Sequence, residues 1–277
     1  MAMNRITLNV ALLSGACALA MAAAAPASAG GADGILPAGT TIALGAQAVV
    51  QPKYEGGKDY EVIVVPTIKF GPGSSPFGSR IQVDFQSLQD VGIGVLNVGN
   101  FSAGPALGYR FDREEDDGRL LRGLGDVDGG LLVGGFVRYD FKPAYIRASY
   151  LTQVTGDENA GGVFRIQGGA DYRLDPRLFV KTFAAVEFGD DDYMQTYFGV
   201  TAAQSARSGL RAFNAEAGAK SFHLGLTADY EVFPTWTLTA GVEYVRLLGD
   251  AADSPVVEEE NQVIGRIGLS KSFTLGQ

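Results

Sequence analysis

Cysteine and histidine are almost absent from this sequence. Cys17 and His223 are the only residues of their kinds among 277 positions. Cys17 lies in an N-terminal segment that we predict to be removed, which leaves no cysteine for a disulfide or a nucleophile. A Ser–His–Asp triad or a zinc site would have to use His223. Because no G-x-S-x-G motif accompanies it, we predict that the protein is not an enzyme and holds no cofactor or metal.

Positive charge is also scarce. The chain has 22 Lys+Arg against 31 Asp+Glu, a net charge of −9. An acidic balance of this size argues against a nucleic-acid partner.

Long apolar runs are missing beyond residue 29. The one apolar run, residues 6–24, follows Arg5 and precedes an Ala27-Ser28-Ala29 cleavage site, so residues 1–29 are predicted to be a signal peptide. The alternative, a lipoprotein anchor at Cys17, has Ser14 where a leucine is usual. Without a run of helix-spanning length, residues 30–277 can cross a membrane only as a closed β-barrel.

Residues 101–141 contain two runs of alternating apolar residues on either side of a charged loop. The apolar positions are Phe101, Ala103, Pro105, Leu107, Tyr109 and Phe111, then Leu131, Val133, Gly135, Val137, Tyr139 and Phe141. A period of two is typical of a strand with one apolar face. Each run has about ten residues, the length that a tilted strand needs to cross a bilayer. We therefore predict a transmembrane β-hairpin whose acidic loop, residues 112–117, lies outside.

The rest of the chain repeats this pattern. The predicted strands lie within residues 42–50, 62–70, 80–86, 91–97, 101–111, 131–141, 144–153, 164–173, 178–188, 221–230, 236–244 and 263–273. Short turns follow the even-numbered strands and longer loops follow most odd-numbered ones, as in outer-membrane barrels of Gram-negative bacteria. Counting residues 193–200 as a strand would place the acidic loop 249–261 on the wrong side. We predict an all-β, single-domain antiparallel transmembrane barrel of about twelve strands.

Two alternatives stay open at this point. A soluble, secreted all-β protein also alternates, although its strands are ordinarily about five or six residues long. The charges on the polar faces could line a selective pore or form an interlocked plug, and we favour the plug. These candidate lumen charges are Arg80, Asp84, Arg147, Arg165, Asp171, Arg173, Lys181, Glu187, Asp229, Glu243 and Arg266.

The outer loops carry three acidic clusters, at residues 112–117, 190–192 and 258–260. They could bind divalent cations that bridge lipopolysaccharide, but their spacing matches no known ligand loop. Solvated loops are the favoured interpretation. Outer-membrane lipid and lipopolysaccharide are the partners that the barrel itself predicts.

Several short stretches resemble the MipA/OmpV family of outer-membrane proteins, over residues 42–273. They are Pro52-x-Tyr54-x-Gly56, Gly104-Pro105 with Tyr109-Arg110, residues 121–128 (LRGLGDVD), residues 195–200 (QTYFGV) with 208–210 (SGL), and residues 254–257 (SPVV). One departure is that Phe273 is followed by four more residues, whereas barrels of this kind usually end on an aromatic.

The resemblance implies a role that strand periodicity does not. It implies a scaffold that joins a murein-degrading lytic transglycosylase to a penicillin-binding murein synthase. The periplasmic turns at residues 71–79 and 231–235 are then the expected contact sites. The alternative is a small-solute channel or a porin-like protein of osmotic response or adhesion.

Overall fold

Antiparallel β-strands make up most of the described chain. The computed structural model describes residues 41–70, 82–157 and 160–274. The strands are β1 (Thr41–Pro52), β2 (Tyr60–Phe70), β3 (Gln82–Ser87), β4 (Asp90–Gly94), β5 (Leu96–Val98), β6 (Phe101–Arg110), β7 (Gly130–Phe141), β8 (Ala144–Gln153), β9 (Gly162–Asp175), β10 (Leu178–Gly189), β11 (Gly218–Phe233), β12 (Trp236–Leu247) and β13 (Asn261–Thr274). The helices are η1 (Arg119–Leu121), α2 (Asp191–Phe198), α3 (Ala202–Ser208) and α4 (Gly249–Asp253). Within the described ranges, no helix has the length and apolar character needed to cross a membrane.

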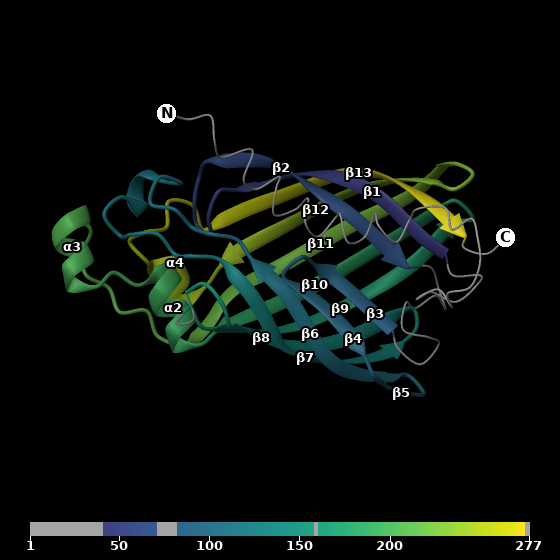
Figure 1. Cartoon of the computed structure of the whole chain (residues 1–277), viewed down its shortest axis with the longest axis horizontal. Coiled ribbons are helices and arrows are strands. Elements are labelled where there is room, and N and C mark those ends of the chain that lie inside the picture. Colours follow the sequence, from purple (N-terminus) through teal and green to yellow (C-terminus); the bar gives the residue numbers. More distant parts are fainter. Residues whose placement is uncertain (1–40, 71–81, 158–159, 275–277) are drawn as a thin grey trace, which may run out of the picture.

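The strands form one curled sheet (Figure 1) in the order β2-β1-β13-β12-β11-β10-β9-β8-β7-β6-β4-β3. Most strands that are consecutive in the chain are neighbours in the sheet, and β1 also pairs with β13. Within the described residues, no pairing joins β2 to β3, and residues 71–81 between them lie outside the description. The curl is tight enough for Gln167 on β9 to donate to Gln86 on β3 at 3.0 Å.

The predicted count of about twelve strands is confirmed, with β4 and β5 together taking the place of one of them. The weakest of them, residues 91–97, is broken at Val95 into β4 and β5, and both pieces pair with β6. Val91 lies opposite Leu107, but Leu96 lies opposite Ala103, so the register changes by one residue between them. One extra residue on one strand is a β-bulge, which bends the strand. This bend explains why the apolar alternation of this segment is weak.

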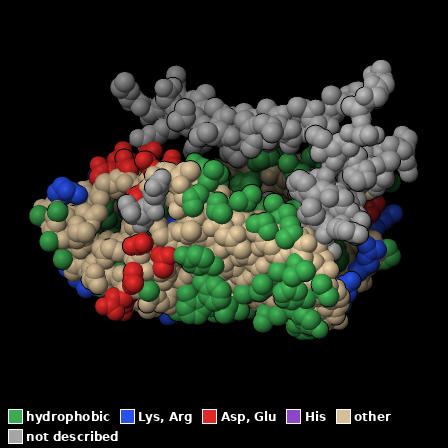
Figure 2. All heavy atoms as spheres, turned by 60° about the horizontal axis from the view of Figure 1, so that its bottom comes forward, with side chains coloured by type: hydrophobic (Ala, Val, Ile, Leu, Met, Phe, Trp, Pro, Cys, Tyr) green, Lys and Arg blue, Asp and Glu red, His purple; other side chains and the backbone are tan. Residues whose placement is uncertain are grey.

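The two faces of the sheet differ as the alternation predicted. On β7, Leu131, Val133, Val137 and Tyr139 are all exposed, whereas the intervening Leu132 is only 3% exposed and Phe136 only 4%. Outward apolar side chains continue around the wall on β8, β11, β12 and β13. Figure 2 shows them gathered over the strands, while most of the acidic side chains in that view lie toward the end with the long loops. An apolar surface of this extent matches contact with lipid.

The connections differ between the two ends of the sheet. Tight turns at residues 99–100, 142–143, 176–177 and 234–235 join strands at one end, and loops at 53–59, 111–129, 154–161, 190–217 and 248–260 join them at the other. Residues 193–200 do not form a spanning strand, because most of them belong to helix α2 inside the longest loop. The same loop also contains α3.

Four of the long loops fold together into a structure that we call the outer cap: residues 53–59, 111–129, 190–217 and 248–260. Its apolar core consists of Tyr54, Leu121, Leu124, Tyr193, Met194, Phe198, Val200, Ala215, Leu247, Ala251 and Val256. A second, smaller cluster lies on the inner face of the sheet and contains Ala106, Leu132, Phe136 and Leu151. On this side Gly92 is required, because a Cβ atom there would lie 2.6 Å from the Phe136 ring.

Candidate functional site

A cavity of about 420 Å³ extends from beneath the outer cap into the lumen. The inner face of β1 and β2 and the tip of the β3–β4 hairpin both line it. Part of its wall is apolar, formed by Val49, Ile63, Val65, Val245 and Ile264. Val49 lies directly opposite Ile63 in the β1–β2 register. Alternation alone predicted polar residues at inward positions, so this apolar patch corrects that expectation for the outer half of the lumen.

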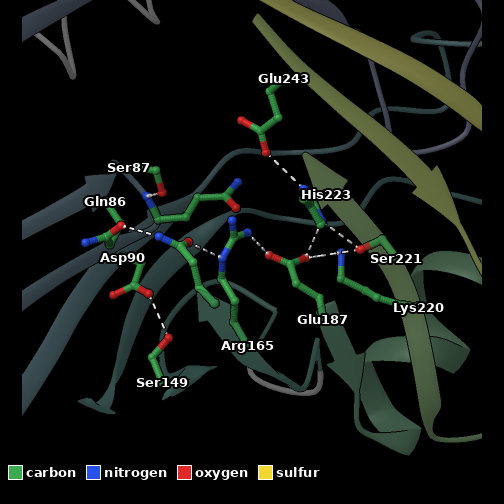
Figure 3. Close-up of polar contacts among 12 residues, drawn as sticks. Gln86, Ser87, Asp90, Ser149, Arg165, Glu187, Lys220, Ser221, His223 and Glu243 are labelled. Atoms are coloured by element: carbon green, nitrogen blue, oxygen red, sulfur yellow. Dashed lines mark hydrogen bonds and ion pairs between the residues drawn. The ribbon is translucent and has the colours of Figure 1, made fainter. Parts of the chain in front are cut away.

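Glu187 on β10 is the centre of the largest charge network in the lumen (Figure 3). Its Oε1 lies 2.5 Å from Arg165 Nη1 on β9, and its Oε2 lies 2.9 Å from Lys220 Nζ on β11. His223 Nε2 is 3.5 Å from the same Oε2. Buried charges are stable only when paired in this way, because each loses its hydration on leaving water.

The network continues upward into the outer cap. Lys220 Nζ also lies 2.6 Å from Glu55 Oε1 in the loop after β1. The Tyr193 hydroxyl of α2 donates to the other Glu55 oxygen at 2.8 Å. Burial raises the pKa of Tyr193 well above its usual range, so this hydroxyl keeps its proton and remains a donor. The lumen and the cap are therefore one connected polar structure.

His223 has the hydrogen-bond partners of a hydrolase triad, but the serine of this arrangement is buried. Its Nε2 is 2.9 Å from Ser221 Oγ, and its Nδ1 is 2.9 Å from Glu243 Oε1. The other oxygen of Glu243 pairs with Arg266. Ser221, however, is 1% exposed and does not line the cavity. Glu187 Oε2 accepts from Ser221 Oγ at 3.4 Å, which puts a carboxylate beside the place where an oxyanion would develop. Ser221 is therefore not placed to attack a substrate in the cavity.

A second network fills the lumen near the β3–β4 hairpin. Arg147 on β8 binds both oxygens of Asp90 at 2.6 Å and reaches Asp84 Oδ2 at 2.7 Å through Nε. Arg138 joins Asp84 to Asp140 and stacks on Tyr145, with 3.8 Å between the guanidinium carbon and the ring centroid. Such bidentate arginine–carboxylate pairs are rigid as well as strong. They hold β3 and β4 against β7 and β8 across the lumen.

A third contact bridges the lumen toward the end with tight turns. Lys69 on β2 lies 3.0 Å from Asp229 on β11, and Lys181 on β10 lies 3.5 Å from the other oxygen of the same carboxylate. β2 and β11 are not adjacent in the sheet. The pair therefore spans the interior rather than following the wall.

The structure places most of the predicted lumen charges in these networks. Those that take part in ion pairs are Asp84, Arg147, Arg165, Lys181, Glu187, Asp229, Glu243 and Arg266. Within the described residues, Asp171 and Arg173 form no ion pair; Asp171 is half-buried and Arg173 is exposed near the end of β9. Arg80 lies outside the described residues.

The sequence analysis did not identify several residues of these lumen charge networks. These are Glu55, Lys69, Asp90, Arg138 and Lys220. Lys69 and Arg138 stood on the polar faces of predicted strands, which was a usable signal. Lys220 gave none, because it occupies a bulge: Glu187 pairs with Ser221 and Phe188 with Ala219, which leaves Lys220 without an opposite residue. A bulge re-aims a side chain, here into the lumen beside Ser221.

The outer cap is closed by contacts between distant loops. The Tyr54 hydroxyl donates to the carbonyl of Val256 at 3.2 Å. Burial raises the pKa of Tyr54 to about 12, with Glu258 and Asp59 adding to the shift. Four of the five motif stretches that carry the family resemblance meet here, since the cap core includes Tyr54, Leu121, Leu124, Phe198, Val200 and Val256.

Many of the acidic loop residues bind the backbone of the cap itself. Glu115 accepts from the amide of Gly123 at 2.9 Å, and Asp117 accepts from that of Glu114 at 2.8 Å. Asp190 caps the N-terminus of α2. Glu258 pairs with Lys58 at 3.1 Å. Among the described residues, no group of three or more His, Cys, Asp or Glu side chains is arranged to hold a metal ion.

Comparisons with known proteins relate this chain to one family of outer-membrane proteins. Residues 44–273 match the profile of the family described as MltA-interacting protein MipA. The MltA-interacting protein of Escherichia coli K12 is 25% identical over 165 residues, 59% of this chain and 64% of the relative. Outer membrane protein OmpV of Vibrio cholerae is 24% identical over 212 residues, 74% of this chain and 77% of OmpV. The NanC porin structure is 11% identical with a TM-score of 0.40, covering 83% of this chain and 98% of the porin.

Proposed function

This chain belongs to the MltA-interacting protein MipA family of outer-membrane β-barrel proteins, and we propose that it acts as an adaptor for murein enzymes. In this proposal, a murein-degrading transglycosylase binds the periplasmic end of the barrel, and a penicillin-binding murein synthase binds through the same assembly. The name of the Escherichia coli relative, MltA-interacting protein, supports the first partner. The match spans 64% of that relative's length, so both partners are proposals for this chain.

One observation carries the proposal: ion pairs cross the interior of the barrel. The Arg147–Asp90 and Lys69–Asp229 pairs cross the lumen at different levels, and the outer cap lies over the cavity of about 420 Å³ at its outer end. A barrel crossed by salt bridges in this way suits a rigid membrane anchor better than a conduit. Binding to other proteins then falls to the surfaces beyond the membrane.

The periplasmic surface within the described residues consists of tight turns. The turn between β11 and β12 presents Phe233, which is 69% exposed, two residues after the exposed Glu231. An exposed aromatic beside a charge is a common anchor of protein interfaces. The other predicted contact, residues 71–79, lies outside the described residues.

Capture of partners from detergent-solubilised cell envelopes tests the adaptor. We expect the tagged wild type to retain a murein transglycosylase, and the double variant Glu231→Lys/Phe233→Ser to retain much less. The matched control is Arg207→Ser/Arg211→Ser, which changes two residues of the outer cap. Equal capture by all three proteins, or no murein enzyme with the wild type, would reject the proposal.

The second candidate is a small-solute channel, and the cavity of about 420 Å³ in the outer half of the lumen favours it. Conductance of purified protein in a planar bilayer separates the two. The adaptor predicts no steady current. A steady, ion-selective current would favour the channel.

A further inference from the structure

Two buried arginines lie at the outer end of the cavity without a carboxylate partner. Arg110, the last residue of β6, and Arg113, in the following loop, are each 7% exposed. Within the described residues, neither has a carboxylate oxygen within ion-pair distance. Burying a guanidinium group is unfavourable because the group loses its hydration, unless an opposite charge compensates for the loss. These two positions are therefore unusual in a protein with a net charge of −9.

The guanidinium groups of both arginines lie near the ring of the same tyrosine. The guanidinium carbon of Arg110 is 5.5 Å from the centroid of the Tyr197 ring, and that of Arg113 is 5.4 Å from it. Arg113 Nη1 donates to the Tyr197 carbonyl at 3.0 Å, and Arg110 Nη1 donates to the carbonyl of Ala160 at 3.1 Å. Neutral carbonyls satisfy some of the donors but do not balance the charge.

One polar atom of this group also lacks a partner. Arg113 Nε is buried and makes no hydrogen bond within the described residues. Burial lowers the pKa of Arg113, which reflects the same lack of compensation. Arg110, Arg113 and Tyr197 all line the cavity. The unpartnered donor thus belongs to the wall of a space that a ligand can occupy.

Most other buried charges that line the cavity are already paired. Lys220 is held by Glu55 and Glu187. Glu243 faces Arg266, and Asp90 faces Arg147. Lys53 also lines the cavity but is exposed. The buried positive charge that has no carboxylate partner is consequently at Arg110 and Arg113.

We propose that the cavity binds a small organic anion, whose carboxylate or phosphate group lies against Arg110 and Arg113. Guanidinium groups bind both kinds of anion through paired hydrogen bonds. The apolar wall of the same cavity, which includes Val49, Ile63 and Val65, suits an apolar portion of the ligand. A volume of about 420 Å³ lies in the range of small-molecule sites. This site is independent of the adaptor role.

Calorimetric titration of the full-length protein in a neutral detergent tests the site. The probes are benzoate, phenyl phosphate and benzyl alcohol, which share a ring and differ in the head group. We expect at least one of the two anions to bind at least about tenfold more tightly than the alcohol. The better of the two anions identifies the head group. Anions that bind no more tightly than benzyl alcohol would overturn the proposal, and this comparison needs no variant.

The variant Arg113→Gln assigns the binding to this place. It keeps a hydrogen-bond donor and removes the charge, so anion affinity is expected to fall about tenfold while benzyl alcohol is unaffected. Arg211→Gln is the control, because Arg211 is an exposed cation of the same cap that stacks on Phe213. Unchanged anion affinity in Arg113→Gln, or an equal loss in Arg211→Gln, would place the anion elsewhere and overturn the proposal.

Discussion

Lys220 Nζ lies 2.9 Å from Glu187 Oε2, although the register of β10 and β11 gives Lys220 no opposite residue. The bulge that removes Lys220 from the pairing is what directs its ammonium group into the lumen. From there it also reaches Glu55, 2.6 Å away in the loop after β1. A local irregularity of one strand thus joins the barrel wall to the outer cap.

Replacing Lys220 by Met is expected to destabilise the folded barrel by about 3–5 kcal/mol, because two carboxylates lose their shared cation inside the lumen. The measurement is the urea concentration at which the heat-modifiable, folded form disappears on a gel. Lys58→Met is the control. Its exposed pair with Glu258 is worth at most about 1 kcal/mol, so its midpoint should stay close to wild type. Equal midpoints for the two variants would show that the Lys220 pairs do not stabilise the barrel.

Val137 and Arg138 are adjacent on β7 and face opposite ways. Val137 is 46% exposed on the apolar surface, whereas Arg138 pairs inside with Asp84 and Asp140. Val137→Arg is expected to cost about 2–4 kcal/mol near the bilayer midplane, and Arg138→Val about 1–3 kcal/mol. The fraction of each variant that reaches the outer membrane in folded form shows which substitution is more damaging. If Arg138→Val failed and Val137→Arg assembled normally, the two faces of β7 would be reversed.

Alkaline pH is expected to open the outer cap. The Tyr54 pKa is about 12 in the folded protein against 10.0 for an ordinary tyrosine, so folding favours the neutral hydroxyl. Its contribution to stability is complete below pH 10 and is lost as the pH rises from about 10 to 12. Limited proteolysis of the cap loops between pH 8 and 12 should show cleavage only in the upper range.

The variant Tyr54→Phe provides the control for this pH effect. It cannot ionise, so its cap should resist cleavage to higher pH, even though it loses the hydrogen bond to Val256. The remaining alkaline sensitivity is expected from Tyr193, whose pKa burial also raises. An identical pH onset in both proteins would mean that Tyr54 does not govern opening.

Ser221→Ala is expected to leave any ester hydrolysis by the purified protein unchanged. Ser221 Oγ is buried beside Glu187 and is not offered to the cavity. Release of p-nitrophenol from short acyl esters is the readout, with His223→Gln measured alongside. A rate that disappears in both variants while folding is retained would show that the Ser221–His223–Glu243 arrangement is catalytic after all.

The alternation of apolar residues predicted the strands well, because a period of two records which face meets lipid. Where the backbone departs from that period, the apolar pattern did not predict the pairing of the strands. The bulges at Val95 and Lys220 each shift the register, and no apolar pattern marks either of them. Polar faces were sufficient to nominate Arg147 and Glu187 for the lumen, but not to say that they pair with Asp90 and Lys220.

The sequence analysis did not predict the outer cap, and this omission is larger than that of the two bulges. Its core brings together Tyr54, Leu121 and Phe198 from three loops that are far apart in the chain. Loop residues follow no fixed period, so their apolar side chains give no direction for packing. The charged residues around them, such as Glu115, suggested solvated loops, whereas Glu115 in fact accepts a hydrogen bond from a backbone amide.

The pairing of β1 with β13 has a consequence for assembly. Thr41 lies opposite Thr274 and Val50 opposite Gly265, so this seam joins the two strands most distant in sequence. Loop closure over such a separation is entropically costly and slow. A chain that enters the membrane from its N-terminus exposes the free edge of β1 until β13 arrives. During that interval the edge can pair with another protein's strand, and an assembly factor that occupies it would prevent aggregation until the seam closes.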